Sequence, residues 1–200
     1  ARTGGSSPRG ESWCRLLGIL IPGHPDTWRY IVKIAYADPP YFGMCAKFQH
    51  YHPDGQCWNF IETHRSLIKR LEEYDGWALS LHLPSLAAML SECPQGTRVG
   101  AWVKPFASWK PNVFPAYAWE PVLFRTTPKR EKRPTARDWV SANITLRQGL
   151  TGAKPRAVAH WIFDILGAVP TDEFYDLFPG TGAVGDAWKT WKPREFDVHR

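Results

Sequence analysis

Short, continuously apolar runs recur along the chain and end abruptly at proline, glycine or charged residues. Strands that are buried on both faces of a parallel sheet have this pattern, because neither of their faces meets water. The clearest run begins at Ile31 and stops at Asp38, which is followed by two prolines that have no amide to donate to a sheet. The pattern therefore predicts a buried strand whose carboxyl end lies at Asp38.

The rest of the chain alternates between predicted strands and predicted helices. Further apolar runs predict strands at residues 76–83, 98–103, 120–124 and 173–178. Apolar residues at helical spacing, or a proline at a first helical position, predict helices at residues 61–74, 84–90, 156–166 and 183–191. Residues 138–152 are polar and are expected to form a loop. This order is typical of an α/β fold with a mainly parallel, twisted sheet that is flanked by helices.

The length of 200 residues, with 44% hydrophobic and 22% charged residues, is typical of one globular domain. Residues 1–12 are rich in glycine, serine and arginine and are expected to be a disordered tail, which leaves residues 13–200 as a single domain. The apolar run at residues 16–21 is too short to cross a membrane, and the four cysteines have no paired spacing. We therefore expect a soluble, cytoplasmic protein that does not contact a membrane.

Basic residues outnumber acidic ones, 25 to 19, which gives a formal net charge of +6. A positive surface suits a polyanion such as nucleic acid, and it is also compatible with solubility alone. Much of the excess lies in a run at residues 125–137, in which the basic residues include Lys129, Arg130, Lys132 and Arg133. We interpret this run as a loop that contacts phosphates, with an ordinary solvated loop as the alternative.

A predicted loop at residues 42–58 contains histidines and cysteines that invite comparison with a metal site. The candidate ligands are Cys45, His50, His52 and Cys57. Their spacing matches no standard structural zinc pattern, so the sequence favours a lid or a contact surface instead. No metal site is predicted.

The tetrapeptide Asp38-Pro39-Pro40-Tyr41 is a candidate functional motif, because open α/β sheets bind their ligands beyond the carboxyl ends of the strands. From average residue usage, it would occur by chance in roughly one chain in a thousand of this length. An ordinary proline turn after a strand is the alternative interpretation.

A second candidate motif lies where the last predicted strand meets the last predicted helix. It reads Asp176-Leu177-Phe178-Pro179-Gly180-Thr181-Gly182. A glycine-rich turn before a helix lets a ligand approach the backbone and the amides at the helix start. Alone, this pattern is equally compatible with an ordinary turn between a strand and a helix.

Together the two motifs resemble those of the S-adenosylmethionine-dependent DNA amino-methyltransferases, adenine-specific type. That family carries an Asp/Asn/Ser-Pro-Pro-Tyr tetrapeptide and an Asp-x-Phe-x-Gly-x-Gly turn. The tetrapeptide comes first in this chain, as in the circularly permuted beta class, and Lys154-Pro155 resembles the Lys-Pro element of that class. The resemblance extends over about residues 31–191 and implies a circularly permuted, Rossmann-like methyltransferase fold.

The resemblance also assigns catalytic chemistry to the tetrapeptide, without a metal. An exocyclic amine conjugated to a base ring is a poor nucleophile, and acceptors around its N–H groups favour the pyramidal form that can attack. The Asp38 carboxylate and the Pro39 carbonyl are the implied acceptors, and Pro40 stiffens the loop together with Pro39. Tyr41 would stack on the target base, which must be flipped out of the DNA to reach the site.

The glycine turn and the Lys-Pro element are the implied S-adenosylmethionine site. The residues assigned to it are Asp176, Phe178, Gly180, Thr181, Gly182, Lys154 and Pro155. Members of the family also hold the ribose hydroxyls with an acidic residue at the end of the next strand. Here Glu195 or Asp197 could serve, but neither lies in a convincing strand, and at this point the chain departs from the family pattern.

The aspartate at the start of the tetrapeptide favours adenine in DNA as the methyl acceptor. The same chemistry on cytosine or on RNA is one alternative, and a catalytically inactive nucleic-acid-binding module is another. The intact tetrapeptide argues against an inactive module, whereas the lack of a clear acidic ribose anchor argues for it. A nicotinamide dehydrogenase is disfavoured because the turn lacks the third glycine. The recognition sequence and the oligomeric state are not predicted.

Overall fold

The computed structural model describes residues 31–44, 55–106, 113–128, 134–144 and 153–194. Contacts divide the chain into two units, Ala1–Ile31 and Val32–Arg200, and every described helix and strand belongs to the second. Some predicted features lie outside the described residues, namely the tail at residues 1–12, Cys45, His50, His52, Lys129, Arg130, Lys132, Arg133, Glu195 and Asp197. None of the described helices is long and apolar enough to cross a membrane.

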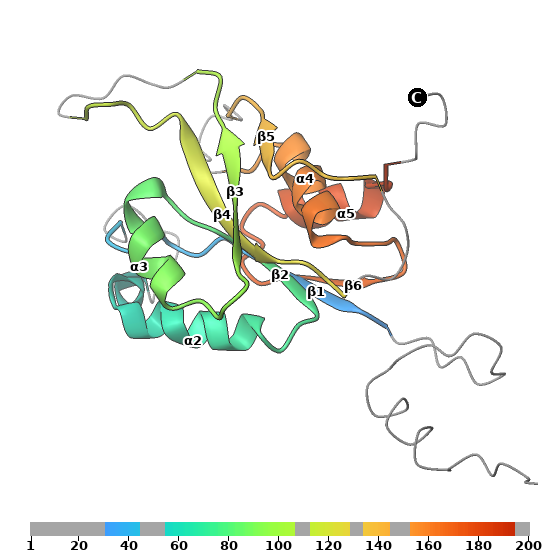
Figure 1. Ribbon diagram of the computed structural model, residues 1–200, viewed down its shortest axis with the longest axis horizontal. Coiled ribbons are helices and arrows are strands. Elements are labelled where there is room, and N and C mark those ends of the chain that lie inside the picture. Colours follow the sequence, from blue (N-terminus) through green and yellow to red (C-terminus); the bar gives the residue numbers. More distant parts are fainter. Residues whose placement is uncertain (1–30, 45–54, 107–112, 129–133, 145–152, 195–200) are drawn as a thin grey trace, which may run out of the picture. The chain divides into compact units, whose positions relative to one another are not determined.

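Six strands in the described part of the chain form one sheet in the order β5-β3-β4-β2-β1-β6 (Figure 1). They are β1 (Lys33–Ala37), β2 (Gly76–Ser80), β3 (Arg98–Val103), β4 (Trp119–Arg125), β5 (Trp139–Ser141) and β6 (Glu173–Asp176). β1 pairs in parallel with β2 and β6, and β3 pairs in parallel with β5, whereas β4 is antiparallel to both of its neighbours. The prediction of a mainly parallel sheet is confirmed.

Helices cover both faces of this sheet (Figure 1). They are α2 (Ile61–Leu71) and α3 (Leu86–Ser91) on one face, and α4 (Arg156–Leu166) and α5 (Ala183–Thr190) on the other. In β1, Ile34 and Tyr36 belong to the core cluster of α4 and α5, whereas Ala35 and Ala37 belong to that of α2 and α3. Burial on both faces explains why the strand sequence is apolar without alternation.

α4 has the bounds that the sequence predicts, and most of its side chains are buried. Its end is set by Gly167, whose φ of 72° lies in the left-handed region that favours glycine. The next amide, of Ala168, donates to the Phe163 carbonyl at 3.0 Å and satisfies one carbonyl of the last turn. α4 is therefore a rigid support for Lys154 and Pro155, which directly precede it.

The two edges of the sheet differ from the sequence prediction. Residues 138–152 are predicted to be a loop, and this is wrong for β5, which pairs with the edge of β3. β5 is too short and too exposed to produce an apolar run. β6 is predicted to be buried, but it is an edge strand in which every second residue is exposed.

A glycine in β3 allows close packing of the sheet against α4. A Cβ atom added at Gly100 would lie 2.9 Å from two ring carbons of Trp161, whose side chain is buried. We therefore expect Gly100→Ala to lower the free energy of unfolding by roughly 1–3 kcal/mol. A matched control is Gly185→Ala in α5, where the described residues place no atom within 4 Å of the new Cβ apart from the adjoining residues and the backbone of the helix itself. This change should raise stability by about 0.5–1 kcal/mol. Urea unfolding followed by circular dichroism measures both effects, and equal effects would contradict the packing described.

Candidate active site

The two sequence motifs lie next to each other, just past the carboxyl ends of β1 and β6. β1 pairs in parallel with β6, so that Tyr36 lies opposite Asp176, and the Leu177 amide donates to the Tyr36 carbonyl at 2.9 Å. The helix after β1 covers one face of the sheet and the helix after β6 covers the other. Adjacent strands whose helices diverge in this way form the crevice where open α/β sheets bind ligands.

Asp38 lies just past the carboxyl end of β1, in contact with a buried cation. The Lys154 ammonium is 2.8 Å from each carboxylate oxygen of Asp38 and donates to the Tyr41 hydroxyl at 3.0 Å. The Tyr41 hydroxyl in turn lies within donating distance, 3.3 Å, of the Asp38 carboxylate. Pro39 and Pro40 are both buried, so the loop that presents Asp38 is held in place. The structure thus brings Asp38, Tyr41 and Lys154 together.

These contacts set the charge states of the cluster. Burial alone would lower the pKa of Lys154, but the Asp38 and Glu120 carboxylates outweigh it, and this pKa is raised above its ordinary value. Burial raises the pKa of Tyr41 well above its ordinary value, and the same two carboxylates raise it further. Lys154 is therefore a cation and Tyr41 a neutral hydrogen-bond donor over the whole physiological pH range.

The Tyr41 ring has a stacking partner within the protein. It stacks on the His82 ring with centroids 5.5 Å apart and an interplanar angle of 10°. His82 is fixed in turn by a 2.9 Å contact between its Nδ1 atom and the Ser85 hydroxyl. The stacking of Tyr41 on a target base stays a prediction.

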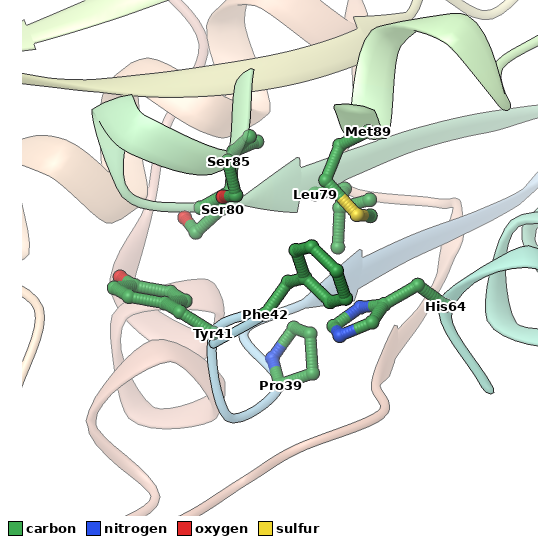
Figure 2. A pocket seen from close by; sticks show the side chains of 9 residues that line it. Pro39, Tyr41, Phe42, His64, Leu79, Ser80, Ser85 and Met89 are labelled. Atoms are coloured by element: carbon green, nitrogen blue, oxygen red, sulfur yellow. The ribbon is translucent and has the colours of Figure 1, made fainter. Parts of the chain in front are cut away.

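A small cavity lies behind the tetrapeptide, where Pro39, Tyr41 and Phe42 approach β2 and α3 (Figure 2). Its volume of about 10 Å³ is on the scale of one water molecule, so the cavity is not a substrate pocket. His64 also lines the cavity; it is buried, which lowers its pKa, and its Nε2 atom lies 2.9 Å from the Trp58 carbonyl oxygen. We interpret His64 as a neutral packing residue.

The glycine turn follows β6 and leads into α5. Gly180 and Gly182 have φ values of 46° and 75°, a conformation that disfavours other residues. In the described part of the chain, no side chain forms a capping hydrogen bond with the backbone amides at the N-terminus of α5. Phe178 lies behind the turn and packs against Trp58, with ring centroids 5.2 Å apart. The turn therefore presents mainly backbone, since two of its residues are glycines. Thr181, which lies between them, is exposed.

Asp176, at the start of the glycine turn, has an unsatisfied carboxylate oxygen. Its Oδ1 atom accepts a hydrogen bond from the Phe178 amide at 3.3 Å, but its buried Oδ2 atom has no partner among the residues that the structure describes. Burial raises the pKa of Asp176 to about 6, and the nearby Asp38 carboxylate raises it as well. An acceptor in this condition is suited to a cationic or hydrogen-bond-donating ligand.

The structure brings two further residues to the site for which the sequence predicts no role, although both lie in segments, 102–104 and 119–123, that resemble later strands of the family. Lys104 follows β3, Glu120 is the second residue of β4, and the two form an ion pair. Glu120 also accepts from the Tyr41 hydroxyl at 3.3 Å. The resemblance covers its segment, but the antiparallel direction of β4, which brings Glu120 close to Tyr41 and Lys154, is not evident from the sequence. Lys154, which the resemblance assigns to the cofactor, has its ammonium on Asp38, and its predicted role toward a cofactor stays a prediction.

No protein family model and no curated protein matches this chain. Among solved structures, it is similar to the crystal structure of the M1.HpyAVI-SAM complex, with a TM-score of 0.50 and 16% identity over 80% of this chain and 77% of that chain. A crystal structure of M1.HpyAVI has a TM-score of 0.44 at 16% identity, over 80% and 76% of the two chains. The similarity to the complex shows the fold, which is the Rossmann-like methyltransferase fold predicted above.

The ion pair of Lys154 with Asp38 should matter for stability, because the lysine side chain is only 5% exposed. Lys154→Met leaves Asp38 without its cation, and we expect it to lower the free energy of unfolding by roughly 1–3 kcal/mol. Lys189→Met is the matched control, since Lys189 pairs with Asp186 at the same distance of 2.8 Å but on the surface. The control should change stability far less. Urea unfolding of both variants at pH 7 measures the difference, and similar losses would contradict a special role of the buried pair.

Proposed function

We propose that this protein is an S-adenosylmethionine-dependent methyltransferase that methylates the exocyclic amino nitrogen of adenine in DNA. The observation that carries the proposal is the meeting of Asp38 and the Asp176 glycine turn at the carboxyl ends of two adjacent parallel strands. Asp38 provides a carboxylate to which an amine can donate. The glycine turn provides an unsatisfied carboxylate oxygen, that of Asp176, and exposed backbone to which a cofactor can bind.

The glycine turn fits S-adenosylmethionine in charge and in shape. That cofactor carries an ammonium group, a carboxylate and a positively charged sulfur, and when bound it supplies an electrophilic methyl group. The orphaned Oδ2 atom of Asp176 suits the ammonium group, and the uncapped amides of α5 suit the carboxylate. A Cβ atom at Gly182 would meet nothing within 4 Å, so the turn is open to a ligand. M1.HpyAVI, whose fold this chain resembles, was crystallised as a complex with SAM.

Asp38 is suited to activate an amine. Its carboxylate is fixed by Lys154 and by the buried prolines that follow it, so its direction changes little during a reaction. As the amine attacks, its nitrogen becomes positively charged and its N–H groups become better donors, and a fixed carboxylate binds this state better than the flat starting amine. The Pro39 carbonyl is the proposed second acceptor.

DNA as the substrate rests on charge and on the family resemblance. The net charge of +6 favours a polyanion, and Lys129, Arg130, Lys132 and Arg133 are proposed to contact its phosphates. A base inside a duplex does not reach a site at the edge of a sheet, so the target base would be flipped out and stacked on Tyr41. Adenine is preferred over cytosine because the tetrapeptide begins with aspartate, as in the adenine-specific enzymes that it resembles.

The direct test is transfer of labelled methyl from S-adenosylmethionine to unmodified duplex DNA. The wild-type protein should label DNA, and Asp38→Ala should reduce the rate at least roughly a hundredfold, because the fixed acceptor is lost. Calorimetry should show that this variant still binds S-adenosylmethionine, since the glycine turn is intact. Full activity of Asp38→Ala would contradict the role of Asp38, and a wild-type protein that neither labels DNA nor binds the cofactor would contradict the proposed function.

The role of Asp176 predicts how cofactor binding depends on pH. Its pKa of about 6 lies above its ordinary value, so Asp176 becomes protonated and loses its charge as the pH falls below 6. If the carboxylate binds the cofactor's ammonium group, affinity should be constant above about pH 7 and fall by up to about tenfold per unit below pH 6. Calorimetry from pH 5 to 8 measures this dependence.

Two variants separate this effect from other pH effects. Asp176→Asn should bind more weakly at pH 7 and lose most of the pH dependence. Asp186→Asn, which changes an exposed aspartate in the adjacent helix α5, should retain it. The same pH dependence in Asp176→Asn and in the wild-type protein would exclude Asp176 as its source.

A further inference from the structure

The antiparallel direction of β4 brings a second carboxylate to the candidate site. Because β4 runs opposite to β2 and β3, its first residues lie on the side of the sheet where the carboxyl ends of β1, β2 and β3 lie. The register with β3 places Trp119 opposite Val103 and Glu120 opposite Trp102, so that Glu120 lies beside the end of β3. The side chain of Glu120 is 20% exposed, the same fraction as that of Asp38.

Glu120 contacts the Tyr41 hydroxyl and lies next to two ammonium groups, one of which also pairs with Asp38. Its Oε1 atom pairs with the Lys104 ammonium, and its Oε2 atom lies 3.3 Å from the Tyr41 hydroxyl and 4.0 Å from the Lys154 ammonium. Two carboxylates and two ammonium groups therefore form a single, electrically balanced network around the Tyr41 hydroxyl. The resemblance to the family assigns a role to Asp38 but none to Glu120.

The geometry of the Tyr41 hydroxyl makes Glu120 and Asp38 competitors for the same hydrogen bond. The phenol oxygen accepts a hydrogen bond from Lys154, and its single hydrogen can point to only one acceptor at a time. Asp38 and Glu120 are both 3.3 Å away. When the hydrogen points to Asp38, it weakens this carboxylate as an acceptor, and when it points to Glu120, Asp38 keeps a lone pair for the amine of a substrate.

We propose that Glu120 is a positioning residue of the transfer site, which draws the Tyr41 hydrogen bond away from Asp38 and so keeps Asp38 available to the target amine. This inference rests on the function proposed above. Lys104 supports the arrangement, because its ion pair holds the Glu120 carboxylate and compensates its charge. Glu120 acts on the reaction through Tyr41, so removal of the Tyr41 hydroxyl should remove the effect of Glu120.

The test is a double-mutant cycle that keeps the net charge of the network constant. Lys104→Met and Glu120→Gln, introduced together, remove one positive and one negative charge and leave a weaker acceptor near Tyr41. We expect this pair of changes to lower kcat on the order of tenfold, with little change in KM for DNA, because the Tyr41 hydrogen then turns to Asp38. Combined with Tyr41→Phe, which keeps the ring and removes the hydroxyl, the same pair should lower kcat less than about twofold.

Controls separate a positioning role from a structural one. Glu92→Gln is the matched control, because Glu92 is also 20% exposed and pairs with Arg65, but on the surface and outside the network; it should leave kcat unchanged. Equal losses of kcat with and without the Tyr41 hydroxyl would overturn the inference, as would no loss in either background. If the wild-type protein transfers no methyl group, the proposed function fails and this inference fails with it. If the wild-type protein is active but the effect of the Lys104 and Glu120 changes does not depend on the Tyr41 hydroxyl, only this inference is overturned.

Discussion

The parallel pairing of β1 with both of its neighbours is the constraint on which the candidate site depends. It fixes the ends of β1 and β6 side by side, although the two strands lie near opposite ends of the described chain. The helices that follow these two strands cover opposite faces, and open α/β sheets bind their ligands at such a position. A shift of register between β1 and β6 would separate Asp38 from the glycine turn, and neither motif could act with the other.

The charged groups near the carboxyl end of β1 lose hydration when they are buried, and this cost in free energy argues that they serve a function. An ammonium group that is almost fully enclosed, such as that of Lys154, needs partners to compensate for the water it has lost, and Asp38 and Glu120 provide them. A well-packed apolar cluster would serve stability at least as well. The unsatisfied oxygen of Asp176 is a further cost that the fold does not need. Both features are explained if this edge binds a cofactor and a substrate.

The sequence predicts the central strands of the sheet better than its edge strands. β1, β2 and β4 are recognisable because burial on both sheet faces leaves apolar runs, and α4 leaves a helical pattern with a glycine at its end. β5 is too short for such a signal, and the direction of β4 leaves no trace in its own composition. The site follows the same division: Asp38 and the glycine turn lie in motifs to which the sequence assigns a role. Glu120 comes close to Tyr41 and Lys154 because β4 is antiparallel, and Lys104 follows β3 and pairs with Glu120.

The identity of the methylated base tests the central claim most directly, because it depends on Asp38, the glycine turn and the target amine acting as one site. Duplex DNA labelled by the wild-type protein would be digested to nucleosides and separated by chromatography with mass detection. We predict that the label is on the exocyclic nitrogen of adenine. Label on a ring carbon, on an oxygen or on the protein itself would contradict the account, because an acceptor carboxylate at Asp38 serves an amine and none of these.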